Sequence, residues 1–316
     1  MARTVDITVP NLTGRRAVLT GGSDGIGVHI ASRLAAAGAD LVLPVRNEEK
    51  GRAAVERIRA QSPAAHVTLR ELDLSSLSSV ARFTASLRDE GTPVDILIDN
   101  AGLMTPPSRQ ETADGFEVQF GTNHLGHVAL IAGLMPLLRA GRARVVSQIS
   151  VAANRGSINW SDLNWEQSYD GMAAYSQSKI AMGLFAVELG RRSEASGWGI
   201  TSVLSHPGVA PTSLLSARPE VGRDDDTRSV RLIRWLSARG LVVGTPETAA
   251  LPAVLAATDA DAANGTFYGP TGLGHLGGAP GTQKLYSRLQ SAADAARVWD
   301  ESQRLVDVRF PSAADA

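Results

Sequence analysis

The 316-residue sequence predicts an α/β protein, a doubly wound parallel sheet with helices on both faces. Two observations predict it. Short runs rich in leucine and β-branched residues alternate with longer helical patterns, which is typical of βαβ units. A glycine-rich loop also follows the first run, where such a unit turns from strand to helix. We expect a single domain over residues 1–316, with a sheet of about seven strands.

The strands are short and mostly apolar, as expected where helices cover both sides of a sheet. In order they are residues 16–20 (RAVLT), 40–45 (DLVLPV), 66–72 (HVTLREL), 94–98 (VDILI), 144–149 (RVVSQI) and 200–204 (ITSVL). The stretches between them are longer and rich in alanine and charged residues, which favours helices. The expected helices are 26–37, 48–60, 77–89, 114–139, 173–193 and 230–238.

Two segments depart from this alternation. Residues 213–240 begin polar, include a charged run at 223–226, and then become helix-like. They are interpreted either as a solvated surface loop or as an insertion that forms a lid over a substrate. Residues 295–316 carry no motif, and we expect a peripheral C-terminal tail there.

Composition narrows the function classes. The net charge of −1 gives no electrostatic footprint for nucleic acid or an anionic membrane. The absence of cysteine excludes disulfides and thiolate metal sites, and we expect no metal. The most apolar stretch, residues 128–138, is too short to span a bilayer, and the N-terminus does not resemble a signal peptide. We therefore expect a soluble cytoplasmic protein.

The loop after the first strand reads TGGSDGIG, with glycines at 21, 25 and 27. Glycine lets the backbone approach a pyrophosphate, and the following helix N-terminus favours an anion. A tight strand-to-helix turn is the ordinary alternative, but the position after the first strand favours nucleotide binding. The candidate contacts are Gly21, Ser23, Asp24, Gly25, Ile26 and Gly27.

The end of the second strand indicates which nucleotide binds. An acidic residue there would bond a free ribose 2′-hydroxyl, whereas an arginine accommodates a 2′-phosphate. This strand runs into Arg46 and Asn47 without a carboxylate. NADP(H) is therefore favoured over NAD(H), although Arg46 is also compatible with a surface position at a helix start.

Tyr175 and Lys179 are four residues apart on an expected helix, so they share one face. An ammonium near a phenol favours the phenolate, so we expect a lowered pKa for Tyr175 and a role in general acid–base catalysis. The spacing alone is common. Its weight comes from three other features. Ser150 follows the fifth expected strand, and Asn123 lies in the expected helix before that strand. The Asn100-Ala101-Gly102 turn follows the fourth strand and is a candidate cofactor contact, because its small residues would let a nucleotide pass. Each of these also has an ordinary reading, as a turn or helix residue.

Taken together, these motifs resemble the short-chain dehydrogenase/reductase family, from about residue 12 to residue 278. The resemblance implies a Rossmann-type fold and the catalytic tetrad Asn123, Ser150, Tyr175 and Lys179. It also implies adenine contacts at Asp73 and Leu74, and nicotinamide contacts at Pro207, Gly208, Val209, Ala210 and Thr212. Asp99 and Gln148 depart from the usual pattern.

Within the family the sequence is similar to retinol-dehydrogenase-like and WW-domain-oxidoreductase-like members. The segments TNHLGH (122–127), DLNW (162–165) and GTFYGPTGLG (265–274) carry this similarity. The family mechanism implies hydride transfer between nicotinamide and a carbonyl carbon. Tyr175 would exchange the proton, Lys179 would hold the ribose and lower the pKa of Tyr175, Ser150 would orient the carbonyl, and Asn123 would anchor a relay water.

We expect the substrate to be an apolar carbonyl or alcohol, in a pocket formed by Ser150, Leu214, Leu215 and Trp235, with His206 a further candidate for its wall. Two alternatives stay open: an NADP(H)-binding regulator without turnover, and a reductase of an activated C=C bond. A homodimer or homotetramer is also possible, because family members pair through the corresponding helices. Here the side chains concerned are compatible with a core or an interface: Met182, Leu184, Phe185 and Val187.

Overall fold

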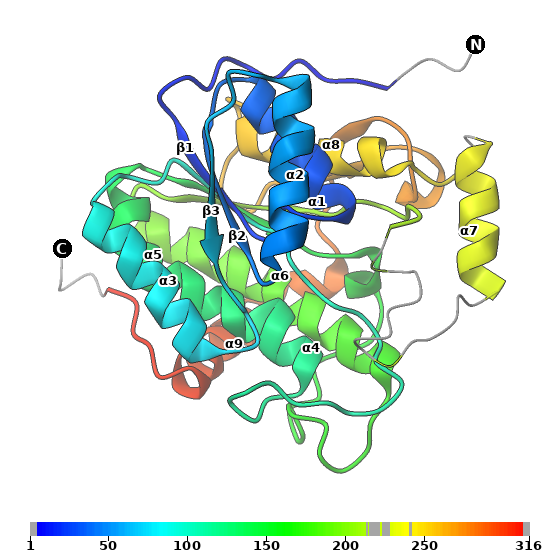
Figure 1. Ribbon diagram of the computed structural model, residues 1–316. Helices are drawn as coiled ribbons and strands as arrows, with labels where there is room; N and C mark the ends of the chain where they lie inside the picture. The colour runs from blue at the N-terminus through cyan, green and yellow to red at the C-terminus, as the bar shows by residue number, and fades with distance from the viewer. Residues whose placement is uncertain (1–4, 213, 215–221, 223–227, 240–241, 312–316) are drawn as a thin grey trace.

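The computed structural model describes residues 5–212, 214, 222, 228–239 and 242–311. These residues form one sheet of eight strands in the order β3-β2-β1-β4-β5-β6-β7-β8. Neighbours are parallel throughout except for β8, which runs antiparallel to β7. The prediction of a doubly wound α/β fold is confirmed (Figure 1).

The strands are β1 (Arg16–Leu19), β2 (Asp40–Val45), β3 (Val67–Glu71), β4 (Ile96–Asp99), β5 (Arg144–Gln148), β6 (Thr201–Ser205), β7 (Phe267–Pro270) and β8 (Pro280–Gln283). The first six lie within two residues of the expected ranges. Strands β7 and β8 were not among the strands expected from the sequence. Each has only four residues, and glycine and proline interrupt the pattern that would mark a strand.

Helices cover both faces of the sheet and enclose two apolar cores. One face carries α1 (Gly25–Ala36), α2 (Glu48–Gln61) and α8 (Pro246–Thr258). The other carries α3 (Leu77–Glu90), α5 (Gly126–Ala140) and α6 (Gly171–Ser196). The strand order reverses between β1 and β4, and in such sheets ligands bind outside the carboxyl ends of the strands at that point.

The helix expected over residues 114–139 is shorter and interrupted. Glu117 caps a single turn, α4 (Val118–Phe120), by accepting a hydrogen bond from the Phe120 amide at 2.7 Å. A π-helical turn, η1 (Gly121–Leu125), follows and leads into α5. Before α4, the Thr112 amide donates to the Phe116 carbonyl at 2.8 Å, so these residues form a turn. Isolated π-turns inside helices are frequent at functional sites.

The prediction of a peripheral C-terminal tail over 295–316 is wrong for its described part. Helix α9 (Ala292–Leu305) packs against α6, and Trp299 is 1 % exposed. The Trp299 ring stacks on Phe185 with centroids 4.8 Å apart, and Phe310 is also buried. The signal was present in the sequence, because buried residues recur in α9 with helical spacing, at Ala295, Val298, Trp299 and Ser302.

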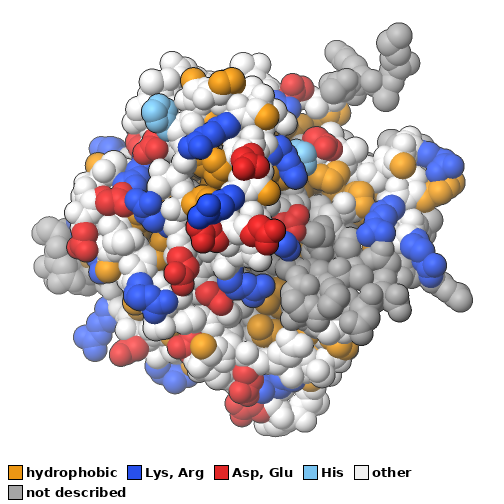
Figure 2. All heavy atoms as spheres, viewed as in Figure 1, with side chains coloured by type: hydrophobic (Ala, Val, Ile, Leu, Met, Phe, Trp, Pro, Cys, Tyr) orange, Lys and Arg blue, Asp and Glu red, His pale blue; other side chains and the backbone are white. Residues whose placement is uncertain are grey.

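On the side of the molecule where both α2 and α3 are seen, basic and acidic side chains are interspersed over the surface (Figure 2). In the part of the chain that the structure describes, no helix combines the length and the apolar character needed to cross a bilayer.

Candidate active site

The loop from β1 to α1 requires glycine where its backbone is left-handed and where two of its segments come close together. Gly21 and Gly25 have φ angles of 65° and 53°, a left-handed conformation that glycine adopts readily. A Cβ at Gly27 would lie 2.0 Å from the Gly21 carbonyl oxygen. Asp24 caps α1 by accepting a hydrogen bond from the Gly25 amide at 2.6 Å. The loop, which also contains Ser23 and Ile26, thus delivers a helix N-terminus at the switch point of the sheet, a place suited to phosphate.

The Asn100-Ala101-Gly102 turn is bound directly to this loop. Asn100 Nδ2 donates to the carbonyl oxygens of Thr20, at 2.9 Å, and Gly21, at 3.3 Å. The backbone amides of Asn100 and Ala101 both donate to the Thr20 hydroxyl at 2.9 Å. A Cβ at Gly102 would lie 3.0 Å from Asn123 Oδ1. The turn therefore fixes the shape of the glycine loop, beyond the permissive role expected from its small residues.

The carboxyl end of β2 places Arg46 in solvent. The Arg46 side chain is exposed, and none of the described residues forms a hydrogen bond or ion pair with its guanidinium. Asn47 has a structural task, because its Oδ1 accepts a hydrogen bond from the Lys50 amide at 2.9 Å and caps α2. Of these two predicted cofactor contacts, Arg46 has the side chain available for a ligand.

The end of β3 holds the two residues expected at the adenine. Asp73 is half-buried, and its Oδ1 accepts hydrogen bonds from the amide and hydroxyl of Ser75, at 2.9 and 2.6 Å. Leu74 is buried, and a Cβ at Gly126 would lie 2.4 Å from its carbonyl oxygen. The close approach joins this strand end to the start of α5.

Tyr175 and Lys179 lie one turn apart on α6, and both are buried. Ser150 follows β5 and caps a short 3₁₀ turn, η2 (Val151–Asn154). The Ser150 side chain acts on the Tyr175 hydroxyl and favours its phenolate form. Lys179 Nζ donates to the Gln148 carbonyl at 3.0 Å. Three of the four predicted catalytic side chains thus meet at the carboxyl end of β5.

The pKa of Tyr175 is shifted in the direction opposite to the expected one. Burial raises the pKa of the Tyr175 phenol because the phenolate loses solvation, and only partial compensation comes from Ser150. The Lys179 ammonium, which was expected to lower the pKa of Tyr175, is directed to the Gln148 carbonyl instead. Burial lowers the pKa of Lys179 itself to about 8.

Asn123, the fourth predicted catalytic residue, lies in the π-turn with its amide fully engaged. Its Oδ1 accepts from the Leu103 amide at 2.9 Å, and Nδ2 donates to the Leu103 carbonyl at 2.9 Å and to Ser178 Oγ at 3.0 Å. The Asn123 side chain thus joins the segment that follows β4 to α6. Its expected part in anchoring a relay water stays a prediction.

Sequence reasoning missed His127 as part of this site, although it stands in the TNHLGH segment. His127 Nδ1 donates to the Asn123 carbonyl at 3.0 Å, so Nε2 of the neutral ring is an acceptor. The Thr20 hydroxyl lies 3.0 Å from that Nε2 and can donate to it. Burial lowers the pKa of His127 to about 3, which keeps the ring neutral. This chain of bonds connects the glycine loop to the π-turn.

The segment after β6 is held by backbone contacts. Gly208 has a φ of 71°, and a Cβ there would lie 2.5 Å from the Leu276 carbonyl oxygen. The Val209 amide donates to that same carbonyl at 2.8 Å. His206 does not contribute a free imidazole, because it is buried, with Nδ1 accepting from the Gly208 amide and Nε2 bonded to Gln283. The expected nicotinamide contacts Pro207, Gly208, Val209, Ala210 and Thr212 follow this turn.

The expected substrate pocket is described only in part. Leu215 and residues 213, 216–221, 223–227 and 240 of the expected insertion lie outside the described residues. Leu214 is half-buried. Trp235 lies on α7 (Arg228–Ala238), is 49 % exposed, and stacks with Arg239, whose guanidinium carbon lies 4.0 Å from the ring centroid. No contact in the described structure joins Trp235 to Ser150, so its place in a pocket stays a prediction.

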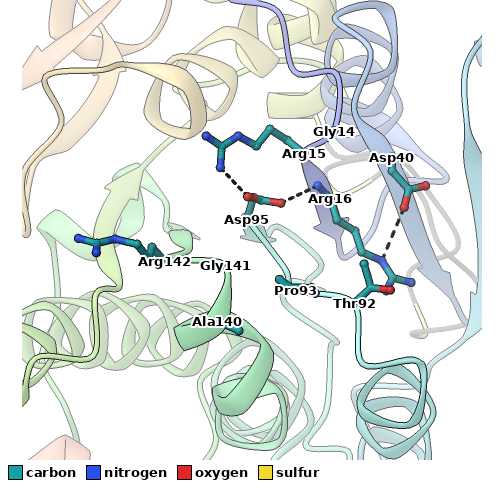
Figure 3. Close-up of a pocket in the computed structure, with 10 residues that line it drawn as sticks. All are labelled: Gly14, Arg15, Arg16, Asp40, Thr92, Pro93, Asp95, Ala140, Gly141 and Arg142. Carbon is teal, nitrogen blue, oxygen red and sulfur yellow. Dashed lines mark hydrogen bonds and ion pairs between the residues drawn. The ribbon is translucent and has the colours of Figure 1, made fainter.

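The chain also has a surface hollow at the opposite end of the sheet (Figure 3). Its volume is about 520 Å³, and it is lined by residues that precede β1, β2, β4 and β5 or begin them. Arg15 and Asp95 pair across it at 2.7 Å, and Arg16 pairs with Asp40 at 3.8 Å. These pairs compensate Arg15 and Arg16 but not Arg142, which also lines the hollow, and the hollow lies away from Tyr175.

Comparison with known proteins agrees with this geometry. The short chain dehydrogenase family model matches residues 15–221. Human (Homo sapiens) retinol dehydrogenase 13 is 38 % identical over 96 % of this chain and 87 % of its own length. An uncharacterised protein from Mycobacterium paratuberculosis has a TM-score of 0.76 at 34 % identity, covering 96 % of this chain and 97 % of the other.

A second solved structure, the Pseudomonas aeruginosa RhlG/NADP active-site complex, has a TM-score of 0.59 at 27 % identity and covers 78 % of this chain and 91 % of its own. The extent of the family match and the identity to the human relative are sufficient to assign the chain. It belongs to the short-chain dehydrogenase/reductase family of oxidoreductases and, within that family, to the retinol-dehydrogenase-like subgroup.

Proposed function

We propose that this oxidoreductase uses NADP(H) to interconvert an alcohol and a carbonyl on an apolar small molecule, with Tyr175 as the proton donor and acceptor. One observation carries the proposal: the Ser150 side chain acts on the Tyr175 hydroxyl and favours its phenolate form, and Lys179 lies one helical turn away. Two hydroxyls and an ammonium at the carboxyl end of β5 can polarise a carbonyl oxygen and supply its proton.

The described residues fit a nicotinamide dinucleotide. The crossing of Gly21 and Gly27 leaves no room for a Cβ, so the loop presents bare backbone at the α1 N-terminus to a pyrophosphate. When bound, the cofactor supplies or accepts the hydride. The similarity to the structure of an NADP complex is consistent with this fit.

The side chains then divide the remaining work. Ser150 holds the substrate oxygen by a hydrogen bond, and Tyr175 gives that oxygen its proton in reduction or removes it in oxidation. One of the three N–H donors of Lys179 binds the Gln148 carbonyl. We assign the other two to the ribose hydroxyls of the cofactor. Asn123 holds the Leu103 backbone and Ser178 in register with this group.

The preference for NADP(H) is tested by Arg46→Ala. A charge-assisted bond to a 2′-phosphate contributes about 1.5–3 kcal/mol, so the Kd for NADPH is expected to rise about 10- to 150-fold. The Kd for NADH should hardly change, since NADH has no 2′-phosphate. Calorimetric titration with both nucleotides at constant ionic strength measures the two effects.

The matched control is Arg52→Ala. Arg52 is also exposed on α2, and its guanidinium pairs with Glu48 at 2.7 Å. This variant should keep the wild-type ratio of the two Kd values. Equal weakening of NADPH and NADH by Arg46→Ala would remove the argument for a 2′-phosphate contact.

The substrate class is tested by following NADPH oxidation with aldehydes and ketones of increasing apolar size, retinal among them. The similarity to a retinol dehydrogenase leads us to expect kcat/KM to rise with apolar surface. Product analysis of a conjugated substrate should yield the unsaturated alcohol. A saturated carbonyl would instead show reduction of the C=C bond, and no NADPH oxidation with any compound would contradict the proposal.

A further inference from the structure

A buried carboxyl group lies behind the active site and has no role in the mechanism above. Asp99 is the last residue of β4 and is 1 % exposed. It is paired in register with Ser147 of β5, so the two side chains leave the sheet on the same face. Leu97 and Val145, two residues earlier on these strands, belong to the core beneath α5 and α6. Asp99 and Ser147 therefore point toward the helix that carries Lys179.

Neither oxygen of Asp99 has a hydrogen-bond partner among the described residues, and the same holds for the Ser147 hydroxyl. A buried carboxylate without compensation is costly, and such a group is retained where a nearby charge or a proton stabilises it. An asparagine at this position would fill the same space without a titratable group.

Two titratable groups from the helices above share this region. Burial raises the pKa of Asp99 well above its ordinary value, and the attraction of Lys179, on α6, opposes this rise only in part. Asp99 in turn opposes the burial that lowers the pKa of Lys179. Burial and the Lys179 charge both lower the pKa of His127, on α5, so its ring is neutral. The charges of Asp99 and Lys179 are therefore coupled, and each favours the ionised form of the other.

We propose that Asp99 is a positioning residue that holds Lys179 in its ammonium form at neutral pH, from a buried position beside Ser147. Lys179 reaches the end of β5 through its bond to the Gln148 carbonyl, the residue after Ser147. A neutral amine at that place would lose the positive charge that is assigned to the ribose hydroxyls. The catalytic part of this proposal rests on the proposed function, whereas the coupling itself does not.

The coupling is tested on the protein alone by NMR with labelled lysine. The sequence holds three lysines, and Lys50 and Lys284 are exposed, so the signal of buried Lys179 stands apart. In the wild type the Lys179 side chain should titrate near its pKa of about 8. Asp99→Asn removes a negative charge but keeps the shape, and the midpoint should fall by about 1–3 pH units. An unchanged midpoint would overturn the proposal.

Glu117→Gln is the matched control, because Glu117 is also a buried carboxyl with a raised pKa, at the start of α4. A glutamine keeps an oxygen for the Phe120 amide, and the Lys179 midpoint should not move. If Asp99→Asn does not fold, carbon-13 labelling of aspartate in the wild type gives the answer. An Asp99 carboxyl that stays protonated throughout the Lys179 titration would contradict the proposal, and one that ionises below it supports it.

The catalytic part is tested by the pH profile of carbonyl reduction. Activity that needs the Lys179 ammonium falls as pH rises through the pKa of Lys179, so Asp99→Asn should lose activity at a lower pH than the wild type and Glu117→Gln. A shifted lysine titration with an unshifted profile would show that the coupling exists but does not govern turnover. Absence of turnover in all three proteins would reject the proposed function while leaving the NMR result valid.

Discussion

Tyr175→Phe is expected to lower kcat for carbonyl reduction by about 10²- to 10⁴-fold, the range of general acid–base catalysis. The substitution removes only the hydroxyl on which Ser150 acts, while the ring keeps its buried position on α6. NADPH binding should therefore stay close to that of the wild type. Steady-state kinetics and a fluorescence titration with NADPH separate the two effects.

Tyr268→Phe is the control for this substitution. It also removes a hydroxyl from a buried ring, but that hydroxyl bonds Asp259 at 2.8 Å, on the side of the sheet covered by α8. Its kcat should match the wild type. Wild-type turnover by Tyr175→Phe, or an equal loss in Tyr268→Phe, would remove Tyr175 from its assigned role.

Trp299→Ala should destabilise the fold by about 3–5 kcal/mol, the usual cost of truncating a fully buried aromatic side chain. The ring stacks on Phe185 and lies 4.4 Å from the Phe310 centroid, with the Arg192 guanidinium above it at 4.8 Å. Its loss leaves a cavity between α6 and α9 that these neighbours cannot close. Urea denaturation followed by circular dichroism measures the change in the free energy of unfolding.

Trp235→Ala is the comparison, since Trp235 is half-exposed and its ring contacts Arg239 at the surface of α7. This substitution should lower the free energy of unfolding by less than about 1 kcal/mol. Where Trp299→Ala cannot be purified, Trp299→Phe keeps a ring against Phe185 and should show an intermediate loss. Equal effects at positions 299 and 235 would mean that α9 contributes nothing special to the core.

The central fold could be predicted because its strands are continuous apolar runs with helices between them. The edge of the sheet formed by β7 and β8 could not be predicted in this way. In β7 and β8 glycine and proline remove the pattern, and the pairing comes from tertiary contact. The prediction of a peripheral tail over residues 295–316 was wrong for a different reason. These residues contain no motif, but the apolar residues of α9 recur with the spacing of a helix that has one buried face. In this segment the periodicity of apolar residues therefore predicts the structure better than the absence of a motif does.

The candidate site likewise has features that the sequence predicts and features that it cannot show. Tyr175 and Lys179 lie on one face of α6 because i and i+4 on a helix share a face, and Ser150 acts on the Tyr175 hydroxyl. Sequence alone cannot show which partners a buried polar group finds. The amide of Asn123 is occupied by Leu103 and Ser178, and the pKa of Tyr175 is raised, since burial outweighs the effect of Ser150.

Helix α9 also bears on how the protein behaves when it is dilute. Met182, Leu184 and Phe185 are buried within a single chain, and Phe185 is covered by Trp299 of α9, so this part of the Tyr-bearing helix needs no second subunit to shield it. A shield supplied by a partner would be lost by mass action at low concentration, whereas one supplied by the same chain is not. Dilution alone is therefore not expected to expose Met182, Leu184 or Phe185 to solvent.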